Sequence, residues 1–368
     1  MNPGRLSPTM YNLMIDKIQG AIQHWSCNFL SYARKLQLIN AVVFGLENFW
    51  CSALLLPLYV TRMVNKLCKD FFWGIIAGQR KMSYKSWNSI CAPWGEGGFN
   101  VKELLSWNKA LLSKWVWQLT THRDCLWDSW SRTYNFKGKS IWEGHALTCH
   151  GESWRDIIKV KDALLELAGS KNAAFSMLNS CVSHGKFMVG RAYSLFRQCR
   201  PKLRWTIPLW SDSILPKHRI CVIQAVQHQL ATVDNINRRG LMLVNRCCLC
   251  MVAQESHRHL FFRCSFSQQV RRNMLAWLGV SGSSSDIDIK NYLYKINAGN
   301  KCNSWRNILS GCSVAGMVYA IWEERNNRLF GEIQATPEMV ASKLQSILKI
   351  RLSDNQHPRI RQWLDFTN

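Results

Sequence analysis

Amphipathic helices account for the hydrophobic pattern of the first third of the chain. Between residues 102 and 119, apolar side chains recur every three or four positions, which places them on one face of a helix. The stripe consists of Leu104, Trp107, Leu111, Trp115 and Leu119. Helical periodicity extends over residues 10–121 and breaks at 92–99, where a proline and three glycines predict a turn.

The periodicity weakens in the middle of the chain. Residues 135–185 are rich in Gly, Ser, His and Lys, and we expect loops with short helices there, with a domain boundary near 140–150. Residues 273–368 return to mixed helical patterns, with a Ser-rich linker at 281–286. The pattern therefore predicts a mainly α fold.

One stretch, residues 41–60, is apolar enough to raise the question of a membrane span. Glu47, Asn48 and Pro57 interrupt it, and the flanking segments are ordinary amphipathic ones. A continuous run of about 20 apolar residues is needed to cross a bilayer. We therefore expect a buried helical hairpin here and no membrane partner.

Composition adds a strong expectation about partners. The 368 residues are 47% hydrophobic, so a packed core is feasible. Lys and Arg number 47 against 23 Asp and Glu, a net charge of +24 that predicts a polyanionic partner, most often nucleic acid. Residues 186–272 hold 15 basic and 3 acidic residues, so half of the net charge lies there. The alternatives are a basic protein that binds no polyanion and one that binds a membrane surface.

Cysteine usage predicts the redox environment. The 15 cysteines are an odd number scattered along the chain, and no apolar signal segment opens the sequence. We expect mostly free thiols in an intracellular, reducing compartment, either nuclear or cytoplasmic.

A cysteine–histidine cluster carries the strongest local chemistry. Cys247, Cys250, His259 and Cys264 follow the pattern C-x2-C-x8-H-x4-C. Two thiolates in a tight turn, followed by an imidazole and a third thiolate, suit a tetrahedral, structural Zn²⁺ with no open position. The alternative is a stretch of buried thiols beside a surface histidine.

Two ligand assignments stay open at this point. Cys248 is an alternative to Cys247, although it leaves a single residue before Cys250. His257 is an alternative to His259, but the apolar residues 260–262 directly after His259 would form a small core beside the metal, which favours His259.

The region around this cluster resembles the reverse-transcriptase zinc-binding domain of plant LINE-type (non-LTR) retrotransposons. The resemblance covers residues 205–277 and runs through Trp210, Leu215-Pro216-Lys217, Asn237-Arg238-Arg239-Gly240, Cys247-x-x-Cys250 and His259-Leu260-Phe261-Phe262-Arg263-Cys264. One helix departs from the family pattern. At residues 221–226 the family is rich in aromatic residues, whereas Gln224, Gln227 and Gln229 make this chain more polar.

Other parts of the chain resemble the region that follows the polymerase core in the same elements. The matching pieces include residues 30–39, Leu55-Leu56-Pro57, Phe72-Trp73-Gly74, Glu96-Gly97-Gly98, residues 107–112 and Trp322-Glu323-Glu324-Arg325-Asn326. The resemblance implies four regions: a helical, thumb- or connection-like segment at 1–135, a loosely structured connection at 136–185, the zinc-binding domain at 186–280 and a C-terminal helical region at 281–368.

The same resemblance implies a polymerase polyprotein, but its catalytic residues are not found. Reverse transcription needs paired metal-binding aspartates, and the sequence contains no Asp-Asp pair. No cluster of four carboxylates suggests ribonuclease H chemistry, and Asp286 and Asp288 form the closest pair, in a Ser-rich linker. We therefore expect no catalytic residue, no enzymatic activity and no small-molecule substrate.

The expected activity is binding of RNA or DNA through phosphate contacts. The predicted contact residues surround the metal ligands in sequence: Arg238, Arg239, Arg246, Arg258 and Arg263. Arginine donates bidentate hydrogen bonds to phosphate, and only Asp234 and Glu255 lie nearby to neutralise this charge. The alternative is a domesticated protein whose zinc module mediates protein–protein contacts.

Overall fold

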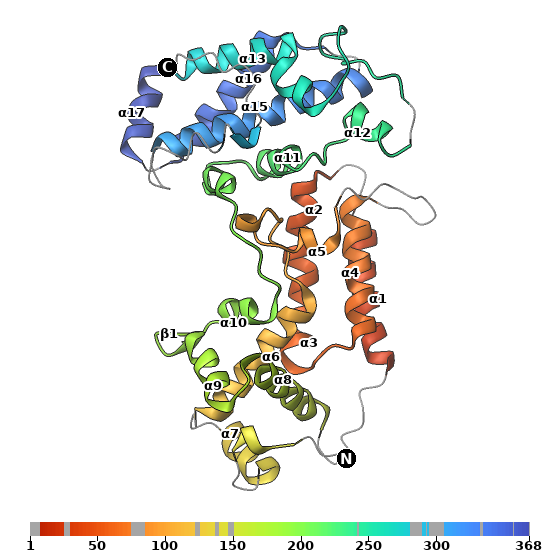
Figure 1. Cartoon of the computed structure of the whole chain (residues 1–368), viewed down its shortest axis with the longest axis vertical. Coiled ribbons are helices and arrows are strands. Elements are labelled where there is room, and N and C mark those ends of the chain that lie inside the picture. Colours follow the sequence, from red (N-terminus) through yellow and green to blue (C-terminus); the bar gives the residue numbers. More distant parts are fainter. Residues whose placement is uncertain are drawn as a thin grey trace.

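The computed structural model describes residues 8–25, 30–74, 85–121, 126–136, 140–145, 151–240, 243–279, 289–291, 293, 305–331, 334–355 and 357–367. This part of the chain is almost entirely helical, as predicted, with one small antiparallel ribbon of β1 (Val182–Ser183) and β2 (Lys186–Phe187). Figure 1 shows helices in three tiers along the long axis of the molecule. The predicted linker at 281–286 lies outside the described residues.

The middle tier holds the N-terminal helices. They are α1 (Pro8–His24), α2 (Tyr32–Leu38), α3 (Phe44–Ala53), α4 (Leu58–Trp73) and α5 (Trp87–Ile90), with a π-helical turn at Ile39–Val43 that joins α2 to α3. Helix α4 begins directly after Pro57 and ends at Gly74, whose φ of 67° is left-handed and favours glycine.

The apolar stretch at 41–60 forms two helices and not one span. The turn between α3 and α4 is held by the buried amide of Asn108, which accepts a hydrogen bond from Leu56 N at 2.7 Å and donates to Cys51 O and Leu54 O. Helix α3 then packs on α6 (Leu104–Thr120). Among the described residues, no helix combines the length and apolarity that crossing a bilayer requires.

The lower tier is built around α6. Its other members are α7 (Leu126–Ser131), α8 (Glu152–Ala168), α9 (Lys171–Ser180) and α10 (Val189–Phe196). Helices α8, α9 and α10 pack against α6, and α7 contacts it through Trp127, whose ring lies 4.7 Å from that of Trp115. The predicted helix at 102–119 is confirmed, but its buried face differs from the predicted stripe, of which Leu104 and Leu119 are buried and the other three residues are half-buried. Leu112, Val116 and Trp117 are buried, and Lys114 is the only exposed side chain of α6.

The expectation of loops and short helices at 135–185 is wrong, because α8 runs for 17 residues. Its buried side chains recur at helical spacing: Trp154, Ile157, Ile158, Lys161 and Leu164. Lys161 interrupts the apolar pattern of this face, and for that reason the sequence did not predict the helix. Lys161 is 2% exposed and satisfies its ammonium through Gly144 O and Asp162, both at 2.8 Å.

The upper tier holds the C-terminal half of the chain, and α15 (Trp305–Phe330) is its central helix. Around it lie α11 (Pro216–Val226), α12 (Val233–Asn237), α13 (Ser265–Trp277), α16 (Pro337–Ser353) and α17 (Pro358–Thr367). Close packing depends on two glycines of α15. A Cβ at Gly311 would lie 2.3 Å from Pro208 O, and one at Gly316 would lie 2.6 Å from a methyl of Leu344.

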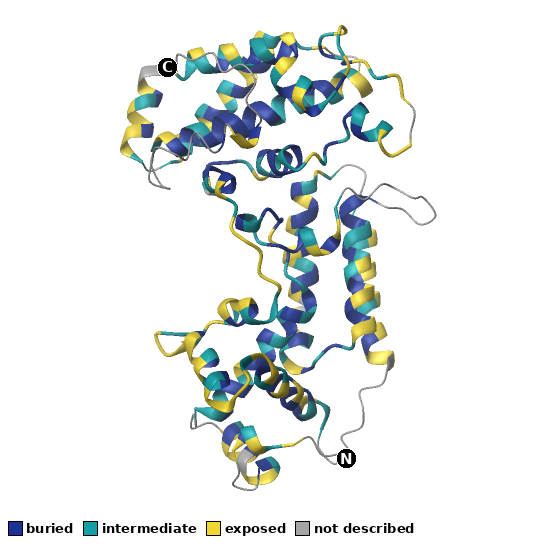
Figure 2. Ribbon diagram, viewed as in Figure 1, coloured by how far each residue is buried: buried dark blue, intermediate teal, exposed yellow. Residues whose placement is uncertain are grey.

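Burial follows the tiers (Figure 2). The middle and upper tiers share one continuous hydrophobic core, which includes Leu36, Phe72, Val222, Val314 and Leu344. The lower tier has a core of its own around α6 and α8.

Candidate metal centre

The turn that carries Cys247 and Cys250 is a compact knuckle. Cys247 N donates to Ala253 O at 2.8 Å, and Met251 N donates to Cys247 O at 2.8 Å. Met251 closes the turn in the left-handed region, with φ of 56°. This reversal brings the two thiols to the same side of the backbone.

A π-helical turn, η6 (His259–Arg263), explains the spacing of the other two ligands. Cys264 N donates to His259 O at 2.7 Å, the five-residue hydrogen bond of a π-helix. Ser256 Oγ accepts from His259 N and caps the start of this segment. Because a π-helical turn brings residues five positions apart to the same side of the helix, the side chains of His259 and Cys264 can reach one metal ion.

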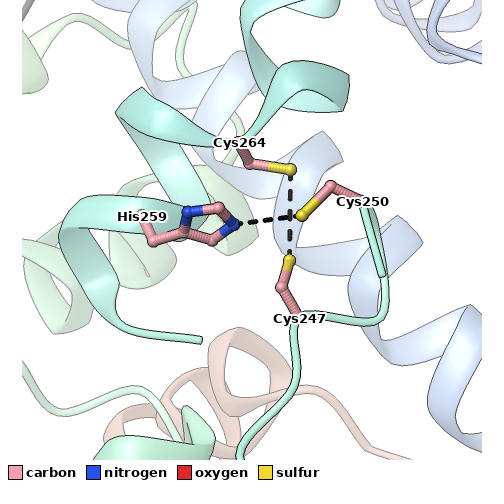
Figure 3. Close-up of side chains that lie close together, drawn as sticks. All are labelled: Cys247, Cys250, His259 and Cys264. Atoms are coloured by element: carbon pink, nitrogen blue, oxygen red, sulfur yellow. Dashed lines mark hydrogen bonds between the residues drawn. The ribbon is translucent and has the colours of Figure 1, made fainter. Parts of the chain in front are cut away.

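The four predicted ligands meet at one point (Figure 3). Their donor atoms all lie within 4.8 Å of one another. Cys247 Sγ is 4.0 Å from Cys264 Sγ, and Cys250 Sγ is 3.3 Å from His259 Nε2. Ligands bound at about 2.3 Å around a tetrahedral zinc are about 3.8 Å apart. The cluster could therefore hold a metal ion with little rearrangement.

The two alternative ligands point elsewhere. Cys248 Sγ lies 3.5 Å from Arg325 O of α15. His257 Nδ1 lies 3.2 Å from Thr232 Oγ1, and its ring packs against Phe261. The predicted small core beside the ligands is present, because Leu260 and Phe261 are buried.

Electrostatics prepare the site for a cation. A hydrogen bond between the Cys247 and Cys264 thiols raises the pKa of Cys247 and lowers the pKa of Cys264, and burial adds to the rise at Cys247. Burial lowers the pKa of His259, which keeps its imidazole neutral and able to bind a metal. A cation at this point would displace the remaining thiol protons, so binding is expected to release protons.

Helix α15 supports the knuckle from a distant part of the sequence. Arg325 forms an ion pair with Glu255 at 2.7 Å, and both side chains are almost fully buried. Glu255 also accepts a hydrogen bond from Val233 N at 2.8 Å. Arg328 donates to Leu249 O at 2.9 Å, within the knuckle itself. The sequence did not predict these contacts of Arg325 and Arg328, although Arg325 lies in the Trp-Glu-Glu-Arg-Asn segment that carried part of the resemblance.

All five arginines predicted to contact nucleic acid have exposed side chains: Arg238, Arg239, Arg246, Arg258 and Arg263. Arg238 forms an ion pair with Asp234 at 3.1 Å, and Arg246 Nε donates to Met251 O at 2.6 Å. They flank the ligands on α12, on the knuckle and at both ends of η6. The nearby Glu255 is neutralised internally by Arg325, so it does not offset this surface charge. Asp286 and Asp288, the closest acidic pair noted in the sequence, lie outside the described residues.

Comparison with known proteins finds a match for the segment that holds the four candidate metal ligands. Residues 187–270 match a family model described as zinc-binding in reverse transcriptase. A putative ribonuclease H protein of Arabidopsis thaliana is 29% identical over 123 residues, which is 33% of this chain and 20% of that protein. An uncharacterized mitochondrial protein of Arabidopsis thaliana is 28% identical over 120 residues, 30% of this chain and 78% of that protein.

The chain thus spans one fifth of the putative ribonuclease H protein and most of the mitochondrial protein. The family match lies within the region predicted at 186–280 and includes all four clustered ligands. Residues 187–270 of this chain are therefore similar to the zinc-binding domains of reverse transcriptases.

Proposed function

We propose that this chain binds one structural Zn²⁺ through Cys247, Cys250, His259 and Cys264, and that it binds RNA or DNA around this centre. In this proposal the chain is a non-catalytic, nucleic-acid-binding part of a retrotransposon reverse transcriptase polyprotein. The observation that carries the proposal is the convergence of four soft ligands inside a segment of the reverse-transcriptase zinc-binding family. No primer extension by the purified chain is expected.

Phosphate contacts are the proposed basis of binding. Arg238, Arg239, Arg246, Arg258 and Arg263 are exposed around the ligands, and guanidinium groups suit phosphate oxygens. Such contacts do not read bases, so binding should tolerate sequence and weaken steeply with salt.

The test is a titration at two salt concentrations. Fluorescence anisotropy would follow labelled single-stranded RNA and DNA of unrelated sequences, with zinc content measured by mass spectrometry on the same samples. Changing Arg238 and Arg239 to Ala should weaken binding of all sequences similarly and lower the salt slope by up to about 2 units. The matched control changes Arg359 and Arg361, two exposed arginines of α17, to Ala. Unchanged affinity and slope in the Arg238/Arg239 variant, with zinc still bound, would contradict the assigned surface.

A second candidate function is a protein–protein contact, and one observation favours it. Four apolar side chains on or next to the knuckle are exposed: Leu243, Val244, Met251 and Val252. Val244 and Val252 are the most exposed, at 91% and 86%. Exposed apolar patches of this kind mark binding surfaces for other proteins. Binding through this patch would depend weakly on salt and would be lost in Val244→Asp, whereas phosphate binding would keep its affinity in that variant.

A further inference from the structure

Two adjoining cavities lie along α15, a larger one within the upper tier and a smaller one at the junction of the middle and upper tiers. One has a volume of about 520 Å³ and the other about 350 Å³, and both are lined by Tyr319, Glu323 and Asn327. The smaller cavity is also lined by residues at the start of α2 and by α11, which lies between α2 and α15 in Figure 1. Junctions of this kind are frequent ligand sites, and both volumes fall in the range of small-molecule pockets.

The smaller cavity is lined by the polar residues that distinguish this chain from the family pattern. Of the three glutamines, Gln227 has a structural role, because it donates to Gly97 O and accepts from Lys85 Nζ. Gln224 and Gln229 line the cavity, and Gln229 Nε2 also donates to Gln227 Oε1 at 2.9 Å. Gln224 is 5% exposed. The amide oxygen of Gln229 is buried without a partner.

Amide groups without partners in a buried position destabilise a fold unless a ligand or water satisfies them. The other walls of the smaller cavity indicate the ligand. They include three half-buried aromatic rings, those of Tyr32, Tyr319 and Trp322. Aromatic rings with side-chain amides are the combination that proteins use for unpaired nucleobases, which stack on the rings and hydrogen-bond through their edges.

The charge of the smaller cavity suits a base better than a phosphate. Glu323 lines both cavities, and its carboxylate accepts a hydrogen bond from Lys343 Nζ at 3.0 Å. Lys217 Nζ lies 4.5 Å from the Tyr319 ring. The charged residues that line the smaller cavity are Lys217 and Glu323, so one ammonium group and one carboxylate leave little net charge there. The exposed arginines of the knuckle offer a better place for phosphates.

The cavity and the knuckle are joined by α15. Asn326 and Asn327 line the smaller cavity, and they lie between Arg325 and Arg328. Arg328 binds a carbonyl of the knuckle, and Arg325 holds the Glu255 beside it. The same turn of α15 therefore contacts both the knuckle region and the smaller cavity.

We propose that the cavity between α2, α11 and α15 accepts one unpaired nucleobase, recognised by Gln224 and Gln229. The inference rests on the proposed nucleic-acid binding and names the place where a base, and not only the backbone, is bound. It implies a preference for single strands over duplexes, because the edge of a paired base is not free to hydrogen-bond with the cavity.

The experiment uses the full chain, with Gln224→Leu and Gln229→Leu combined in one variant. Gln118→Leu in α6 is the matched control, because Gln118 also has a buried amide oxygen without a partner and lies far along the chain from the cavity. Saturation-transfer NMR with free nucleosides tests the cavity without phosphate contacts. Single-stranded oligonucleotides carrying 4-thiouridine then report, after irradiation and peptide mapping, which residues touch the base. Thermal unfolding confirms that each variant is folded.

We expect the wild type and the control to give saturation-transfer signals on the base protons of free nucleosides. Both should also crosslink to the thiouridine base at Tyr32, Tyr319 or Trp322. The double variant should lose both signals and bind single strands at least about fivefold more weakly, with an unchanged salt slope because no charge is removed. Nucleoside signals that persist in the double variant, or crosslinks confined to the knuckle, overturn the pocket while leaving phosphate binding intact. Nucleoside binding without any oligonucleotide binding supports the pocket and overturns the proposed function instead.

Discussion

The knuckle and the lower tier show two different ways of holding a chain segment in place. The lower tier is held by apolar packing between amphipathic helices, with Leu112, Val116 and Leu164 fully buried between α6 and α8. The segment from Cys247 to Cys264 contains a single turn of regular structure. Arg325 and Arg328 of α15 contact this region through an ion pair and a hydrogen bond, and its four candidate metal ligands lie close together.

The two regions are therefore expected to lose stability in different ways. A packed helix loses stability gradually as methylene groups are removed, because each contact contributes a small share. A knuckle held by a metal and by buried ion pairs fails as a unit when one polar partner is removed.

Removal of one metal ligand should separate the two regions most clearly. In Cys250→Ser we expect loss of bound zinc and local unfolding of residues 246–264, because structural zinc contributes about 10–16 kcal/mol of binding free energy in small zinc modules. Amide hydrogen exchange should accelerate there and stay unchanged in α8. Cys199→Ser, which removes an exposed thiol, is the control. A full equivalent of zinc in Cys250→Ser would show that this thiol is not a ligand.

Loss of the buried ion pair between α15 and the knuckle should have the second largest effect. Arg325→Met leaves Glu255 buried without its charge partner, and we expect a loss of about 3–5 kcal/mol in the free energy of unfolding of the upper region. Urea unfolding followed by hydrogen exchange measures it. The control, Lys343→Met, removes the exposed partner of Glu323 and should cost at most about 1 kcal/mol. Equal effects of the two substitutions would refute a supporting role for Arg325.

A cavity in the lower tier should leave the metal centre untouched. Leu112 is fully buried, and Leu112→Ala is expected to lower the free energy of unfolding by about 2–5 kcal/mol. Its zinc affinity, measured by competition with a chelator, should equal that of the wild type. Leu126→Ala, at a position 92% exposed, should change stability by no more than about 0.5 kcal/mol. Weakened zinc binding in Leu112→Ala would mean that the two regions are coupled.

Acid should weaken the upper region more than the lower one. Both buried histidines of the described residues, His218 and His257, belong to the upper region. Burial lowers the pKa of His218 to about 4, from an ordinary value of 6.5. Its contribution is therefore complete above pH 6.5 and is lost as the pH falls towards 4, because the unfolded chain takes up a proton that the folded chain does not.

The loss expected from His218 alone is about 3 kcal/mol between pH 7 and pH 4. Comparison of the wild type with His218→Phe isolates it, since acid release of zinc affects both proteins equally. Phe keeps a ring beside Tyr319, which His218 stacks against at 4.7 Å. The exposed His145→Phe is the control. A wild type and His218→Phe that lose stability in parallel would exclude this histidine as the cause.

The sequence by itself predicted the helical class and the four candidate metal ligands, which the structure brings together. Periodicity identified α6, because an amphipathic helix repeats every 3.6 residues wherever it packs. Spacing predicted Cys247, Cys250, His259 and Cys264, because a knuckle and a single π-helical turn are local structures, but it left Cys248 and His257 as alternatives.

The sequence was insufficient where long-range contacts decide the outcome. Helix α8 was missed because Lys161 stands in its buried face, and only the packed structure supplies the carbonyl of Gly144 that satisfies the ammonium. The choice between Cys247 and Cys248 also needed tertiary structure, since Cys248 Sγ lies against α15. The support of the knuckle by Arg325 and Arg328 joins residues 70 and 79 positions apart, and no local pattern indicates which distant helix will pack there.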